Sequence, residues 1–235
     1  MTTLLWKEYR QNLRFLIGAG IIVLIPYILA FLYGLSYYLL YSHTAHTNRW
    51  FYDLLMAPSA ISLILSIVIT GFVAANMFAG ERVDRSAEFV AYLPIKRRTA
   101  LVSKFIYAAG VSLIACMINY AVFTFTLLML EPASSRREVD LASIVCYAVS
   151  AILIFGVSWL VSAIQKSPVI AGIAGLATVT CIAFTMRFII EPLPGIGASQ
   201  SREARIFWWY FGLSLGIGLL SFIAGCICYL HQVEP

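Results

Sequence analysis

Residues 15–40 read FLIGAGIIVLIPYILAFLYGLSYYLL, and no side chain in this run carries a charge. A helix of this length crosses a hydrocarbon layer of about 30 Å. Pro26 is compatible with such a helix, because neighbouring helices in a membrane accommodate a kink. The run therefore predicts a transmembrane helix, which makes the bilayer the solvent of this protein.

The rest of the chain follows the same pattern. Of the 235 residues, 61% are hydrophobic and 11% are charged, whereas a soluble domain carries roughly 25% charged residues. The predicted spans are 15–40, 57–80, 103–130, 142–164, 169–190 and 206–230. We expect an all-α integral membrane protein, with six transmembrane helices in a single transmembrane domain over residues 1–235. Residues 191–197 are rich in helix breakers, and they form either a surface turn or a segment that re-enters the membrane.

The segment before the first span is amphipathic. Its apolar side chains recur at steps of three and four residues: Leu5, Trp6, Tyr9, Leu13 and Leu16. Charged and polar side chains occupy the other side. This pattern predicts an interfacial amphipathic helix over residues 1–14, lying along the membrane surface. The alternative is a charged stub that continues the first span.

The distribution of basic residues predicts the orientation. Of the 16 Lys and Arg residues, ten lie on one side: Lys7, Arg10, Arg14, Arg82, Arg85, Lys96, Arg97, Arg98, Lys104 and Lys166. The remaining six lie on the other side. Since the side richer in Lys and Arg faces the cytoplasm, both termini are predicted to be cytoplasmic. Trp6 and Trp159 are predicted to mark the inner membrane edge, where amphipathic rings are favoured. Basic groups beside spans contact lipid head groups, so we expect membrane lipid and no nucleic acid as a partner.

The connection between the second and third spans, residues 80–98, is unusually rich in charge. Glu81 and Arg85 are four residues apart and can pair along a helix. Pro94 ends this segment or begins the next helix. The pattern predicts a helix that leaves the membrane, a sharp corner and a basic helix that returns. On these grounds alone, the corner is either a knob that another protein binds or a solvated hairpin with basic anchors.

Within the spans, polar residues are few. Asn119 lies near the middle of the third span beside Tyr120. Because a buried amide needs a partner or a cavity, we expect these residues either to bond neighbouring helices or to line a substrate pathway. No histidine lies deep in a span, and in a helix Cys226 and Cys228 point about 200° apart. We therefore predict no catalytic residue and no metal site.

The run GERVDRSAEFVAYLPIKRRTALVSKF, residues 80–105, resembles the cytoplasmic loop of type-2 ABC exporter permeases. The matching positions are Glu81, Arg82, Glu88, Leu93, Pro94, Arg97 and Lys104. Ser86-Ala87 stands where that family often has Gly-Thr. The opening LLWKEYRQNLRF, residues 4–15, resembles the N-terminal surface helix of the same family.

This resemblance implies a function for the whole chain. It would be the membrane-spanning permease subunit of an ATP-driven exporter in a bacterial inner membrane, forming a homodimer or heterodimer. Each permease subunit would rest its loop on an ABC ATPase subunit, with Glu81, Arg82, Glu88, Leu93, Pro94 and Arg97 as coupling residues. The sequence lacks a GxxxxGK[ST] phosphate loop, so ATP and Mg²⁺ would be bound by the partner, and this chain would hold no cofactor and have no enzyme activity of its own.

The alternative is an ATPase-independent membrane carrier or an assembly or anchoring factor. A carrier driven by ion gradients usually places ionisable groups near the membrane midplane. The midplane of the predicted spans is almost free of charge, which favours the ABC exporter. The same lack of charge suggests an apolar or amphipathic cargo.

Overall fold

The computed structural model describes residues 2–41, 47–83, 96–130, 141–186, 188 and 199–231, and they contain helices and no strand. The helices are α1 (Thr2–Tyr41), α2 (Thr47–Val83), α4 (Arg97–Leu130), α5 (Leu141–Ile164), α6 (Pro168–Thr185) and α7 (Ser199–His231). Each contains a stretch long and apolar enough to cross a membrane. The prediction of an all-α integral membrane protein with six such helices is confirmed. Residues 191–197 lie outside the described residues.

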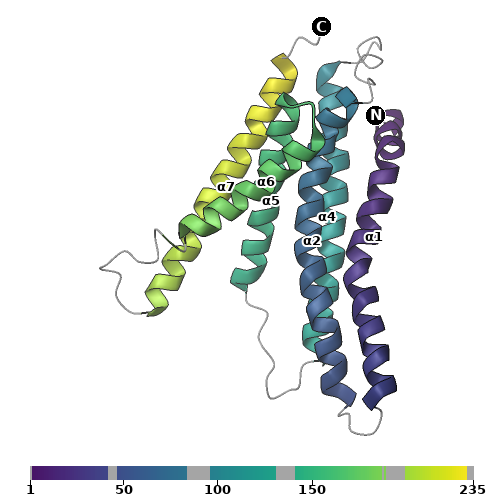
Figure 1. Ribbon diagram of the computed structural model, residues 1–235. Coiled ribbons are helices and arrows are strands. Elements are labelled where there is room, and N and C mark those ends of the chain that lie inside the picture. Colours follow the sequence, from purple (N-terminus) through teal and green to yellow (C-terminus); the bar gives the residue numbers. More distant parts are fainter. Residues whose placement is uncertain are drawn as a thin grey trace.

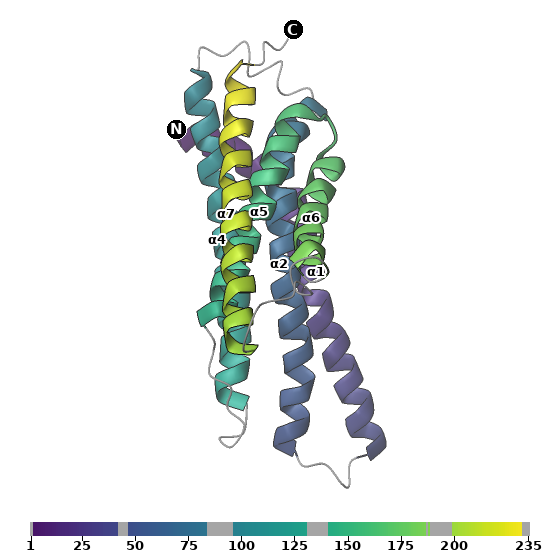
Figure 2. The ribbon, with the colours of Figure 1, turned by 90° about the vertical axis from the view of Figure 1, so that its left-hand side faces the viewer.

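The helices form two groups. Helices α1, α2 and α4 run side by side, and α5, α6 and α7 form the second group, with α7 inclined against α5 (Figure 1). Helix α2 contacts both groups. The start of α1 and the end of α7 lie at the same end of the bundle in both views (Figures 1 and 2). We call this the terminal end; α2 also finishes there, and α4 begins there.

Small residues are frequent in the interior of the bundle, and many large aliphatic side chains face outward. Among the residues whose burial is described, seven serines are at most 1% exposed: Ser59, Ser62, Ser66, Ser103, Ser158, Ser162 and Ser214. By contrast, Leu29 and Leu220 are 61% and 69% exposed. This inversion is typical of membrane proteins, in which small residues let helices approach closely. Tyrosines reach the serines of α2 from both sides: Tyr27 of α1 bonds Ser62 at 2.8 Å, and Tyr147 of α5 bonds Ser66 at 2.6 Å.

Helices α5 and α7 cross with their backbones in contact. A Cβ atom added to Gly156 would collide with the carbonyl oxygen of Gly218, and one added to Gly225 would lie 3.0 Å from the Cα atom of Leu160. Both obstacles are backbone atoms, which a rotamer change cannot move aside. Glycine is therefore required at this crossing for steric reasons.

The N-terminal segment differs from its prediction. Residues 2–14 are the first turns of α1, which continues to Tyr41, so the structure shows them as part of that helix and not as a separate one. Figure 2 shows these turns running across the terminal end, at a steep angle to the rest of the helix. The physical reason lies in its polar residues: Glu8 and Asn12 are each 3% exposed and face protein, while Trp6 is 60% exposed.

Trp159 also lies elsewhere than predicted. Its side chain is fully buried, so it does not mark a membrane edge. It packs among aromatic rings from three other helices, with Phe78 of α2 at 4.6 Å and Phe222 of α7 at 5.6 Å between ring centroids. This aromatic cluster joins the two helix groups near the terminal end.

Replacing Gly156 by alanine should separate α5 from α7 and lower thermal stability. Overpacking a filled interior costs about 1–3 kcal/mol, and here the obstacle is backbone. The measurement is the melting temperature of the detergent-solubilised protein. Gly212→Ala, on the same pair of helices but with nothing within 4 Å of the added Cβ, is the control and should leave stability unchanged or raise it slightly. Equal losses in both variants would contradict the close crossing.

Candidate functional site

Four charged side chains from three helices meet inside the terminal end of the bundle. Lys104 of α4 lies 2.7 Å from Glu81 of α2 and 3.3 Å from Glu8 of α1, measured from Nζ to Oε1. Lys7 of α1 reaches the same Glu81 oxygen at 2.6 Å. Lys104, Glu8 and Glu81 are 1%, 3% and 5% exposed. We call these four residues the charge cluster.

The charge cluster is balanced and well satisfied. Two ammonium groups face two carboxylates, so the formal charges cancel. An ammonium group has three donors, and Lys104 donates to Glu8, to Glu81 and, at 2.9 Å, to the backbone carbonyl of Met77. Burying ions is tolerated only when the geometry and the remaining hydrogen bonds compensate for lost hydration. The cluster meets that condition and joins α1, α2 and α4.

A pair of amides extends this network by one helical turn. Asn76 of α2 donates its Nδ2 hydrogen to Oδ1 of Asn12 on α1. Asn12 in turn donates to the backbone carbonyl of Glu8 at 2.8 Å. The first turns of α1 are thus bound to α2 by polar side chains at two successive levels, which holds this segment across the end of the bundle.

Arg82, the residue after Glu81, points to the other helix group. Its guanidinium donates to the carbonyls of Ser162 at 3.3 Å and Gln165 at 3.1 Å, and also to that of Ala163. These carbonyls belong to the last turn of α5 and to the residue that follows it, where backbone acceptors lack partners in the helix and the helix dipole favours a cation. Consecutive residues at the end of α2 therefore anchor α1 and α4 on one side and α5 on the other.

The predicted coupling residues divide between this network and the following loop. Glu81 and Arg82 lie within the network, and Arg97 is exposed at the start of α4. Glu88, Leu93 and Pro94 lie outside the described residues, as does Arg85, the predicted partner of Glu81. The loop between α2 and α4 thus leaves from Glu81 and Arg82 and returns to the helix that carries Lys104.

The two polar residues of the third span have separate surroundings. Asn119 is 7% exposed and donates to the carbonyl of Ala115 in its own helix at 2.8 Å. Tyr120 faces α5, where its ring centroid lies 6.2 Å from that of Tyr147. The structure thus places Tyr120, and not Asn119, against a cavity between helices.

Sequence reasoning did not assign Lys7, Glu8 or Lys104 to this site. A signal was present for Glu8 and for Lys104. Glu8 and Asn12 are four residues apart and so share one face of a helix, and Lys104 interrupts an apolar span. A charged side chain within a span usually faces the protein interior and pairs there.

These features define a class of protein. The chain is an integral membrane protein whose helices are joined at one end by buried charges, beside the loop that connects α2 and α4. The family model described as "ABC-2 family transporter protein" matches residues 5–183, and the chain belongs to this family. The matched range includes the whole charge cluster. No curated protein and no solved structure matches the chain. The family assigns the chain as a permease subunit of an ABC transporter, which works with an ABC ATPase.

Replacing Lys104 by methionine should destabilise the protein strongly. It would leave Glu8 and Glu81 buried with one lysine between them, and breaking a buried ion pair costs about 3–5 kcal/mol. The measurement is again the melting temperature in detergent. Lys96→Met, which removes an exposed lysine immediately before the same helix, should have little effect.

A compensating variant tests whether charge balance is the cause. Adding Glu8→Gln and Glu81→Gln to Lys104→Met removes the uncompensated carboxylates, so much of the lost stability should return. A Lys104→Met melting temperature equal to that of Lys96→Met would show that the cluster contributes nothing to the fold.

Proposed function

We propose that this chain is the membrane-spanning permease subunit of an ATP-driven exporter, coupled to a separate ATPase subunit through the loop between α2 and α4. The observation that carries the proposal is the network at the end of α2. Glu81 and Arg82 anchor this helix to α1, α4 and α5 at the point where the loop begins. Membership of the ABC-2 family supports the same function.

The network supports a mechanism in which the helices at the terminal end move together. An ATPase that displaced the loop would act on the end of α2 and the start of α4. Because Lys104 bonds Glu81 and Glu8, these helices and the first turns of α1 would move as one body. Arg82 would pass the displacement to α5. Rigid-body motion of this kind is a common means of switching between two states.

The residues of the loop divide into two roles on this proposal. Glu88, Leu93, Pro94 and Arg97 contact the ATPase, whereas Glu81 and Arg82 transmit the movement to the spans. ATP and Mg²⁺ are bound by the ATPase, since this sequence has no phosphate loop of the GxxxxGK[ST] type. The functional unit contains two permease subunits, identical or similar, and two ATPase subunits.

The proposed orientation places the terminal end in the cytoplasm of a bacterial cell. The side predicted to hold ten of the 16 basic residues includes Lys7, Lys96 and Lys166, and a basic side is retained in the cytoplasm. An ATPase that uses cellular ATP must bind on this side. Orientation and ATPase binding are therefore linked requirements of one proposal.

A pull-down from mildly solubilised native membranes tests the partner. An ABC ATPase subunit should co-purify with the wild-type chain and be lost from a Glu88→Lys/Pro94→Ala variant, because the charge and the corner at the binding surface are removed. The readout is identification of co-purified proteins by mass spectrometry.

The opposite loop offers a matched control. Glu138→Lys/Pro132→Ala makes the same two substitutions in the connection between α4 and α5, and it should retain the ATPase. Absence of an ATPase from the wild-type sample, or equal loss in both variants, would contradict coupling through the α2–α4 loop.

Labelling with a membrane-impermeant maleimide tests the orientation. In a variant whose five native cysteines are replaced by alanine, a cysteine at position 96 should react only after the cells are permeabilised. A cysteine at position 136, in the α4–α5 connection, should react in intact cells. The reverse pattern would place the proposed ATPase surface outside the cell and would overturn the orientation.

A further inference from the structure

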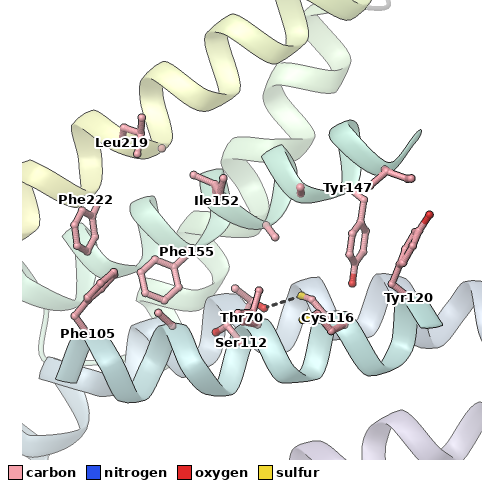
Figure 3. Close-up of a pocket in the computed structure, with 17 residues that line it drawn as sticks. Thr70, Phe105, Ser112, Cys116, Tyr120, Tyr147, Ile152, Phe155, Leu219 and Phe222 are labelled. Atoms are coloured by element: carbon pink, nitrogen blue, oxygen red, sulfur yellow. Dashed lines mark hydrogen bonds between the residues drawn. The ribbon is translucent and has the colours of Figure 1, made fainter. Parts of the chain in front are cut away.

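An open cavity separates two helices that are consecutive in the chain. No pair of described Cα atoms from α4 and α5 lies within 8 Å, although packed helix axes are usually about 8–10 Å apart. The space between them is a cavity of about 530 Å³, floored by Thr70 of α2 and walled on one side by Leu219 and Phe222 of α7 (Figure 3). This volume lies within the roughly 300–1,000 Å³ that is usual for ligand sites.

Aromatic pairs close both ends of the cavity. Phe105 of α4 and Phe155 of α5 have ring centroids 6.4 Å apart at one end, and Tyr120 and Tyr147 have centroids 6.2 Å apart at the other. Figure 3 shows the two pairs at opposite ends of the hollow. These rings bridge helices whose backbones do not touch.

Small residues lie between the aromatic pairs. On α4, Ala109, Ser112 and Cys116 follow Phe105 along one face at steps of three and four residues, and on α5, Ala151 lies between Tyr147 and Phe155. Large rings at the ends and short side chains between them leave the middle unfilled. The sizes of the residues along the facing sides of α4 and α5 therefore account for the cavity.

The cavity is long enough for a lipid chain and opens to the side. Phe105 and Tyr120 are separated by about 22 Å along α4 at 1.5 Å per residue. One leaflet contributes about 15 Å of hydrocarbon, half of a core of about 30 Å. At the rim, Leu113, Met117 and Leu219 are 61%, 63% and 48% exposed. An apolar rim on the lateral surface of a membrane protein faces lipid tails, so the bilayer itself supplies the occupant.

Two hydroxyl groups in the cavity indicate that the occupant also carries a polar group. Ser112 is 6% exposed and lines the cavity, and its Oγ has no hydrogen-bond partner among the described residues. The buried Tyr120 hydroxyl likewise has none there. By contrast, the Tyr147 hydroxyl is bonded to Ser66. A buried hydroxyl without a partner costs free energy, which a ligand oxygen would recover.

The charge of the occupant follows from the lining. None of the described residues that line the cavity is charged. A charged head group placed here would lose its hydration without gaining a counter-ion. The occupant must therefore be uncharged where it meets Ser112 or Tyr120.

We propose that this cavity binds an uncharged amphiphile from the bilayer, with its alkyl chain between Ala109 and Ala151 and its hydroxyl, ester or amide group bonded to Ser112 or Tyr120. The site follows from the shape and chemistry of the cavity and does not depend on coupling to an ATPase. Binding to the purified chain therefore tests it separately from the proposed transport function.

Photo-crosslinking tests the site. The probe is a long-chain fatty alcohol that carries a diazirine in mid-chain, added to the purified protein in lipid nanodiscs, with the labelled residues identified by mass spectrometry. Labels should concentrate on the cavity faces of α4 and α5, and be lost when Ala151→Trp fills the space. Ala177→Trp, on an exposed face of α6 outside the cavity, is the matched control and should retain them.

A variant of nearly unchanged shape tests the polar end. Ser112→Ala/Tyr120→Phe removes both hydroxyls, so the apparent affinity for the fatty alcohol should fall by about fivefold, the factor that one ordinary hydrogen bond contributes. A diazirine-bearing alkane of equal length should bind the variant and the wild type alike.

Three results would overturn the proposal. The first is labelling spread evenly over all lipid-facing helices and unchanged by Ala151→Trp. The second is equal labelling of the cavity by the sulfate ester of the same alcohol. The third is efficient crosslinking of Cys116 to a second copy of the chain in the same nanodisc, which would show that protein fills the groove.

Discussion

The terminal end of the bundle depends on the ion pairs that the ammonium group of Lys104 forms. This group is almost fully buried, and it lies within bonding distance of carboxylates from two other helices. Such an ion is stable in a membrane protein only if its partners are held in place, because the loss of one partner leaves an uncompensated charge. The three helices must therefore keep their relative positions, and the first turns of α1 must cross the bundle where Glu8 can reach Lys104.

Away from this end, the fold follows a different principle. Small side chains, such as Ser66 on α2 and Gly156 on α5, let the helices approach, and many large aliphatic groups face outward. Where small residues on α4 and α5 face one another between aromatic pairs, the helices remain apart and enclose the cavity. The molecule thus combines a polar, tightly joined end with an apolar middle that has room for a ligand. A permease needs both a part that receives force and a part that accommodates molecules.

Much of this architecture could be predicted from sequence, because span length and apolar composition report directly on the bilayer. Predicting six apolar helices needed no knowledge of contacts. The surroundings of Glu8 and Trp159 did need it. An amphipathic pattern shows that a helix has two unlike faces, but it does not show whether the polar face meets water or buried charge. The cavity lay beyond prediction for the same reason: residue sizes along α4 become informative only when the facing stripe of α5 is known.

The most direct measurement is a single-particle cryo-electron microscopy map of the complex isolated gently from native membranes. The proposed function predicts two copies of this chain and density for two ATPase subunits, seated against the α2–α4 loops at the terminal end, beside Glu81 and Arg82. A complex with no ATPase density, or with a partner bound only at the opposite end near the α4–α5 connection, would contradict it.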